Sequence, residues 1–321
     1  MTDQRATQWV RLLAVLFIGA AMGWVGRGLQ TPITLPADAR ISTPAELADH
    51  CPDGEVVIGD LDIIASQLTD LSGLECLREV GGTLTIRDNA RLVSLTLPQL
   101  TSAGTVLVAE NAALVAAEFP ALQSVEHFVQ VHPNRALQAL DLRSLETVGD
   151  HLTIEGNDRL EELRLPKLRS VAGGLTVDSN RDLQSIEVPV LSEVGEYLDL
   201  QANAGIARLD LPQLRSVVGD LELRENASLL SLRAPRLREV GGPVWLYDNP
   251  LLAEVDLPVL EAIGGGIELR QNRELARLQL GEGAIIKGQV RLSPDGATGE
   301  VLDSLRTRLE QGGAAQPAPV Q

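Results

Sequence analysis

The sequence predicts an all-β fold, a right-handed β-helix or solenoid of about eleven coils, from three regular features. An asparagine recurs with a first gap of 22 residues and then gaps of 23. Aliphatic residues stand five and three positions before it, a period of two that is typical of a strand with one buried face. Proline falls nine positions after it in most coils, where a fixed φ suits a corner. The asparagines are Asn89, Asn111, Asn134, Asn157, Asn180, Asn203, Asn226, Asn249 and Asn272.

Each coil is expected to hold three short strands joined by corners. Further apolar residues follow the asparagine at six, eight, eleven and fourteen positions, and glycines precede the strand, where a tight bend needs positive φ. Ser66 and Asp295 take the asparagine position in the first and last coils. We expect the asparagines to form a ladder at one corner, each in the left-handed conformation and bonded to the backbone of the next coil.

The composition limits the classes of partner. The 321 residues carry a net charge of −17, which argues against nucleic acid and against an anionic membrane surface. Aromatic residues make up 2% of the chain, so the core should be built from aliphatic side chains. The repeat runs without interruption, so residues 43–311 are predicted to form one elongated domain.

The N-terminal segment has the features of an export signal. Residues 1–8 are polar and predicted to be cytoplasmic, and residues 9–28 are predicted to be a signal peptide or a signal-anchor helix. Within them, residues 12–25 are uncharged and mostly apolar and follow Arg5 and Arg11. This run is shorter than the ~20 residues of a comfortable membrane span, so cleavage and anchoring both stay open. Either places the solenoid outside the cytoplasm, in the cell envelope or secreted.

Both ends of the solenoid are predicted to be capped. After a linker at residues 29–42, residues 43–46 form a capping box that begins a short helix ending near His50. Residues 298–310 are predicted to form a C-terminal capping helix, and residues 312–321 a disordered tail. One face of that second helix carries Val301, Leu302, Leu305 and Leu309.

The chain has two cysteines, Cys51 after the first predicted helix and Cys76 in the first coil. Export would bring both into an oxidising compartment, so we predict a Cys51–Cys76 disulfide that closes the N-terminal end. Two free buried thiols are the alternative.

Residues 43–89 resemble the start of a receptor L domain. The matching features are the short helix ending in Cys51, the run Val56–Leu61, the run Asp70–Leu74, and a glycine pair leading into the next strand. The likeness extends over residues 43–295. Ordinary leucine-rich repeats place leucine two positions after the asparagine and eight before it, whereas here leucine comes three after and valine or isoleucine nine before. The family includes ligand-binding lobes of the insulin and epidermal growth factor receptors, fungal cell-wall proteins and bacterial surface proteins.

That resemblance implies a β-helix that binds a ligand without catalysis. The receptor lobes are shorter and richer in cysteine, so their ligand sites cannot be carried over by position. The sequence shows no catalytic triad, phosphate loop or zinc spacing, and we expect no enzyme activity, cofactor or metal site. Outward-facing carboxylates leave two alternatives open, a polysaccharide-acting enzyme and a calcium site, although uniform coils provide no long loops to wall a groove.

The candidate ligand-binding face is the outward side of the strand before each asparagine, at positions six, four and two before it. Residues 41–321 contain five aromatic residues, of which only Phe119 is off this face. Exposed tyrosine and tryptophan are favoured interface anchors, although aromatic residues also suit exposed strands in general. We therefore expect a binding or adhesion module for a protein or glycan of the envelope, with a structural spacer as the alternative. The predicted face comprises Phe128, His132, His151, Tyr197, Asp199, Glu222, Trp245 and Tyr247.

Overall fold

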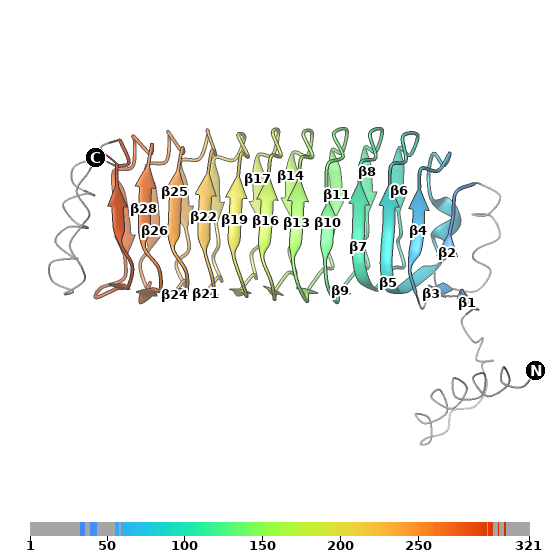
Figure 1. Cartoon of the computed structure of the whole chain (residues 1–321), viewed down its shortest axis with the longest axis horizontal. Coiled ribbons are helices and arrows are strands. Elements are labelled where there is room, and N and C mark those ends of the chain that lie inside the picture. Colours follow the sequence, from blue (N-terminus) through green and yellow to red (C-terminus); the bar gives the residue numbers. More distant parts are fainter. Residues whose placement is uncertain are drawn as a thin grey trace, which may run out of the picture. The chain divides into compact units, whose positions relative to one another are not determined.

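The computed structural model describes residues 33–35, 39–43, 55–57, 59–293, 295–297, 301 and 305. They form a parallel β-solenoid of about ten turns, in which strands of successive coils lie side by side (Figure 1). The all-β class, the 23-residue coil and the three strands per coil are confirmed. The count is about ten turns rather than eleven because the first and last described coils are incomplete.

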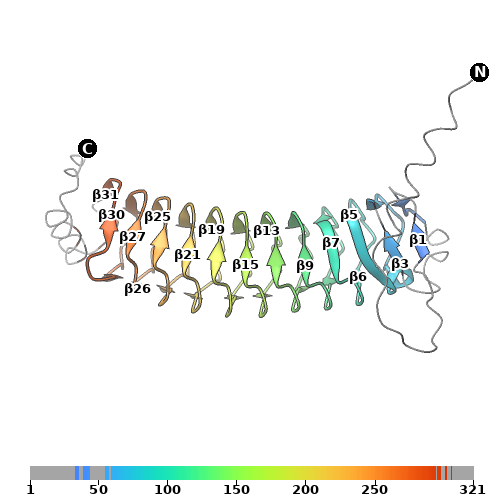
Figure 2. The ribbon, with the colours of Figure 1, turned by 90° about the horizontal axis from the view of Figure 1, so that it is seen from below.

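Three faces run along the solenoid, which we name by the position of their strands in the coil. The front face holds the strand before each asparagine, the back face the next strand, and the side face the last (Figures 1 and 2). Side-face strands join the same hydrogen-bonded sheet as the front face because β5 and β7 run through both.

The front-face strands are β4 (Leu61–Ile64), β5 (Leu77–Arg87), β7 (Ser102–Ala109), β10 (Val129–Val131), β13 (Leu152–Glu155), β16 (Leu175–Asp178), β19 (Leu198–Gln201), β22 (Leu221–Arg224), β25 (Val244–Tyr247), β28 (Ile267–Arg270) and β31 (Val290–Leu292). The back-face strands are β6 (Ser94–Thr96), β8 (Ala116–Glu118), β11 (Ala139–Asp141), β14 (Glu162–Arg164), β17 (Ser185–Glu187), β20 (Arg208–Asp210), β23 (Ser231–Arg233), β26 (Glu254–Leu257) and β29 (Arg277–Leu280). The side-face strands are β9 (Ser124–Val125), β12 (Thr147–Val148), β15 (Ser170–Val171), β18 (Glu193–Val194), β21 (Ser216–Val217), β24 (Glu239–Val240), β27 (Ala262–Ile263) and β30 (Ile285–Ile286).

The core is one continuous aliphatic cluster that runs from Ile41 to Leu305. Phe119 is its one aromatic member within the described residues, and its side chain is fully buried. The apolar positions predicted from the repeat face inward because strand residues alternate between the two sides. Burial of these stacked side chains is the main source of stability, since no coil could bury them unaided.

The asparagines form a buried ladder, but its geometry differs from the prediction in two respects. The Asn180 side chain bonds the backbone of the preceding coil, not of the next: Nδ2 donates to Ile154 O (2.9 Å) and Oδ1 accepts from Asn157 N (3.1 Å). The left-handed residue is the one before the asparagine, such as Ser179 with φ 54°, in every coil except that of Asn134, which follows Pro133. Ser66 joins the ladder, with its N–H donating to Asn89 Oδ1.

Asp295 does not continue this column. It is exposed, and its Oδ1 accepts a hydrogen bond from the Ser293 hydroxyl (2.6 Å). A carboxylate costs much more than an amide to bury, which accounts for its position at the surface. The buried ladder therefore ends at Asn272.

One corner accounts for the single 22-residue gap. The register between β5 and β7 is 23 residues at Val80↔Ala103 and 22 residues at Thr83↔Thr105. The pair Gly81-Gly82 in one coil is therefore matched by the single Gly104 in the next. A Cβ on Gly104 would lie 2.7 Å from the Gly81 and Gly82 carbonyl oxygens, so this tight corner requires glycine.

The prediction of a linker at residues 29–42 was wrong in part. β1 (Ile33–Leu35) and β2 (Ala39–Arg40) pair in parallel with β3 (Glu55–Val57) and β4, and Ile41 is fully buried. These strands lie 22 residues before their partners, so the repeat begins earlier than the asparagine column indicates.

Several predicted end features lie outside the described residues. They include residues 1–8, the export signal at residues 9–28, the helix at residues 44–50, Cys51 and the tail at residues 312–321. Val301 and Leu305 are helical and buried, and the rest of the C-terminal capping helix lies outside the description. Cys76, after the 3₁₀ turn η1 (Ser72–Leu74), is disulfide-bonded. Within the described part of the chain, no helix is long and apolar enough to cross a membrane.

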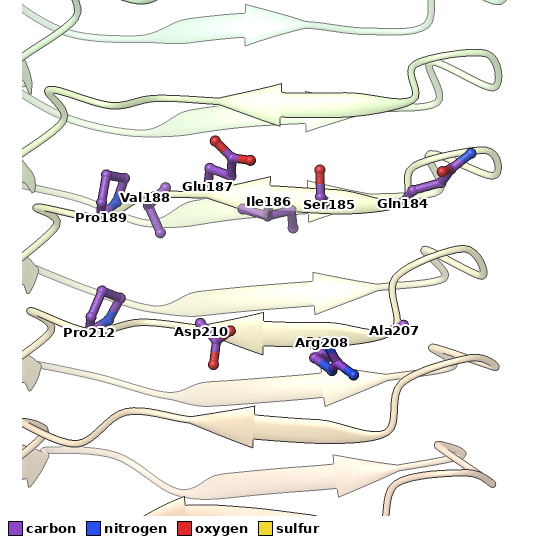
Figure 3. A pocket seen from close by; sticks show the side chains of 10 residues that line it. All are labelled: Gln184, Ser185, Ile186, Glu187, Val188, Pro189, Ala207, Arg208, Asp210 and Pro212. Atoms are coloured by element: carbon purple, nitrogen blue, oxygen red, sulfur yellow. The ribbon is translucent and has the colours of Figure 1, made fainter.

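The back face is interrupted once. β6 to β17 form one five-stranded sheet and β20 to β29 a four-stranded sheet, with no paired residues between β17 and β20. A hollow of about 470 Å³ lies at this break (Figure 3). Glu187 on β17 lines the hollow, and its carboxylate is 3.5 Å from Arg164 of the preceding coil.

Candidate binding face

The predicted ligand-binding residues lie on the outward front face, in three rows that follow the solenoid. We call positions six, four and two before the asparagine the first, second and third rows. Strand register places Asp199 opposite Glu222, Glu222 opposite Trp245, and Trp245 opposite Glu268 along the second row. Adjacent members are about 4.8 Å apart, the spacing of neighbouring strands. Side chains from several coils therefore present one continuous surface.

Three predicted residues of the first row form a stack of rings. The ring centroids of Phe128 and His151 are 5.8 Å apart at an interplanar angle of 18°, and those of His151 and Tyr197 are 5.5 Å apart at 49°. Gly174 occupies the first-row position between His151 and Tyr197, and a Cβ there would lie 2.3 Å from Tyr197 Cζ. The Tyr197 ring can lie over that coil and contact His151 because Gly174 has no side chain.

His151 is also held by two carboxylates. Its Nδ1 lies beside Asp150, and its Nε2 is 3.0 Å from Glu196. Its side chain is 23% exposed, so the imidazole is largely covered. His132 lies half-buried in the third row, and within the described residues no ring contact joins it to the stack. His151 therefore belongs to an organised group, and His132 does not.

An acidic group follows the stack in the second row. Burial raises the pKa of Asp199 and of Glu222, and the nearby Arg224 guanidinium opposes both shifts. Arg224 Nε lies 2.5 Å from Glu222 Oε1, whereas Asp199 Oδ1 is buried without a hydrogen-bond partner. This part of the face can accept hydrogen bonds from a ligand. No group of three or more His, Cys, Asp or Glu side chains in the described ranges is arranged to hold a metal ion.

The remaining predicted aromatic residues form a second group, two coils beyond Tyr197. The Arg270 guanidinium carbon lies over the Tyr247 ring, 5.6 Å from the ring centroid, in a cation–π arrangement. Burial, followed by a hydrogen bond to the Glu268 carboxylate, raises the pKa of Tyr247. Trp245 is half-buried beside them.

The sequence analysis missed three residues that organise this second group. Glu268 is 8% exposed and forms ion pairs with Arg270 and with Arg291, the second at 3.7 Å. All three stand in the second and third rows, so the same positional rule would have found them. The prediction selected aromatic residues and left these charged residues out, because charged side chains are common on an exposed strand.

The structure thus divides the predicted face into three parts, a ring stack, an acidic centre and a Trp245 group. They share one surface, and chemically they provide apolar rings, carboxylate acceptors and guanidinium donors. No protein-family model matches the chain, and neither a curated protein nor a solved structure matches it. The receptor L domain family therefore stays a prediction from the sequence pattern.

Proposed function

We propose that the chain is a non-enzymatic binding or adhesion module of the cell envelope, exported and attached through its N-terminal segment, that holds a protein or glycan on its front face. The observation that carries this proposal is the placement of the aromatic residues. Residues 41–321 contain five aromatic residues, and four of them are half-buried on the front face of the solenoid. Half-buried tyrosine and tryptophan offer large, rigid contact area at low entropic cost.

Location outside the cytoplasm is supported by two features. Residues 12–25 have the length and flanking arginines of an export signal. Cys76 is disulfide-bonded, and structural disulfides persist in oxidising compartments. The receptor L domain resemblance is consistent with a surface module of this kind.

Two other functions remain as alternatives. A structural spacer is favoured by the uninterrupted asparagine ladder, which makes a stiff rod irrespective of any ligand. A polysaccharide-acting enzyme would use outward carboxylates such as Asp199 and Glu222, whose pKa values are raised as in many acid catalysts. The spacer does not explain why the rings gather on one face, and the uniform coils give the enzyme no long loops to wall a catalytic groove.

The test is a capture experiment from envelope extract with the detergent-solubilised full chain. It compares the native chain with the triple variant Tyr197→Ser, Trp245→Ser, Tyr247→Ser. The matched control is Val218→Ser with Ile285→Ser, which removes aliphatic side chains that are 57% and 61% exposed elsewhere on the solenoid. Circular dichroism and thermal unfolding check that all three proteins are folded.

A component retained by the native chain and the control, and lost by the triple variant, would support the binding proposal. Equal capture by all three would favour the spacer. Turnover of envelope polysaccharide by the native chain, lost in Glu222→Gln, would favour the enzyme.

A further inference from the structure

The front face is hollowed beside Trp245. The hollow measures about 280 Å³, a volume that suits a single small ring better than a drug-sized molecule. Pro243, Gly266 and Gln289 line it from the first row, and Trp245, Glu268 and Arg291 from the second. The indole thus stands at the edge of a depression on an otherwise flat sheet.

Polar groups of the hollow are fixed in place. Strand register sets Trp245, Glu268 and Arg291 opposite one another on three successive strands. The Glu268 carboxylate is 8% exposed and is held between Arg270 and Arg291. A carboxylate held between two arginines is an oriented acceptor, and the Arg291 guanidinium and the Gln289 amide are donors beside it.

The charges of the hollow argue against an ionic ligand. A cation attracted by Glu268 would also meet Arg270 and Arg291, whose side chains are 57% and 60% exposed. An anion attracted by those arginines would meet Glu268 and the field of a body with net charge −17. A neutral ligand with many hydroxyl groups avoids both penalties.

We propose that this hollow binds one neutral hexopyranose unit of a glycan chain. This deepens the binding function proposed above and rests on it. The apolar C–H face of the sugar ring packs on the Trp245 indole, and its hydroxyls donate to Glu268 and accept from Arg291 and Gln289. The hollow is open to solvent along the sheet, so the neighbouring sugar units of an oligosaccharide can extend over the front face.

The experiment measures binding of the full chain to cellohexaose, laminarihexaose, maltohexaose and mannohexaose by titration calorimetry. Polygalacturonate and hexalysine serve as acidic and basic comparators. At least one neutral hexaose is expected to bind saturably. Trp245→Ala should weaken that binding about 10-fold, because it removes the apolar surface on which the sugar ring packs.

Glu268→Gln keeps the side-chain volume and removes the charged acceptor, so it should also weaken binding about 10-fold, roughly the value of one charge-assisted hydrogen bond. It provides a second test if Trp245→Ala does not fold. The control is Val218→Ser, which changes a 57% exposed side chain outside the three rows of the front face and should change the affinity less than twofold.

Three results would overturn the inference: no neutral hexaose binds, both hollow variants bind like the native chain, or only polygalacturonate or hexalysine binds. These results leave the wider proposal to its own test. A partner lost by the triple variant in the capture experiment, together with no hexaose binding, would keep the front face as a binding surface and reject the sugar.

Discussion

The asparagine ladder allows a quantitative test at Asn180, in the middle of the column. Substitution by alanine removes a fully buried amide. It deletes the bond from Nδ2 to Ile154 O at 2.9 Å and the bond from Asn157 N to Oδ1 at 3.1 Å. It also deletes side-chain bonds to Asn157 and Asn203 at 3.3 and 3.2 Å. The Asn157 N–H then remains buried without a partner, and the Ile154 carbonyl loses one.

The expected cost follows from these two backbone groups. A buried donor or acceptor that loses its partner costs about 1–3 kcal/mol. Two such groups give about 2–6 kcal/mol, and we expect a value near 4 kcal/mol. In a domain of this size, 1 kcal/mol shifts the melting temperature by about 2–4 °C, so the variant should melt roughly 8–16 °C lower. Gln184→Ala, an exposed change in the same coil, should stay within about 0.5 kcal/mol of the native chain.

The assay is differential scanning calorimetry of the native chain, Asn180→Ala and Gln184→Ala. Hydrogen exchange at the Asn157 amide gives a local measurement, because long repeat arrays do not always unfold in one step. We expect that amide to lose protection in Asn180→Ala. A melting temperature within 2 °C of the Gln184→Ala control, with Asn157 still protected, would refute the view that the ladder amides hold adjacent coils together.

Three further predictions concern the acidic centre, the ring stack and the disulfide. Burial raises the folded-state pKa of Asp199, so the charged carboxylate destabilises the fold above that pKa, and this penalty is lost as the pH falls through it. Asp199→Asn should therefore raise the melting temperature at pH 7, and the difference from the native chain should disappear near pH 3. A difference that stays constant with pH would contradict this. Gly174→Ala places a methyl group against the Tyr197 ring and displaces the ring. It should reduce ligand capture as strongly as Tyr197→Ser and leave the melting temperature nearly unchanged. Undiminished capture would show that the position of the ring does not matter for binding. Cys76→Ser should destabilise the fold by about 2–4 kcal/mol in oxidising buffer. Peptide mapping of the native chain should find a peptide of Cys76 linked to one of Cys51, and a free Cys51 thiol would exclude that pairing.

The fold was predictable because its determinants repeat. Strand positions, inward apolar residues and buried asparagines each recur about ten times, so a pattern of period 23 fixes them together. The left-handed corner could not be predicted, since the residue before the asparagine is variously Ala, Asp, Glu, Ser, Gly or Gln, and in one coil Pro133, so no one residue type marks the position. The strands at Ile33–Leu35 and Ala39–Arg40 were missed because the flanking prolines indicate a linker and the repeat there occurs only once.

The candidate site was predictable at the level of the face and not of its contacts. Strand alternation alone puts Tyr197, Trp245 and Tyr247 on one surface. The contact between Tyr197 and His151 depends on Gly174, whose importance appears only when the ring is seen to occupy its space. Glu268 was missed because a charged residue on an outward strand is expected to be solvated, and only its pairing with two arginines explains its burial.

The direction of the asparagine bonds has a consequence for how such a protein changes length. Each asparagine side chain bonds the backbone of the coil before it and the asparagine of the coil after it, so gain or loss of a whole 23-residue unit joins identical partners and leaves no amide stranded. A change of one residue must instead be absorbed at a corner, as the single glycine at Gly104 does in the 22-residue coil. Length can therefore vary in whole steps of about 4.8 Å, the strand spacing. The extent of the front face is set by the number of coils, and evolution can adjust it without redesigning any one of them.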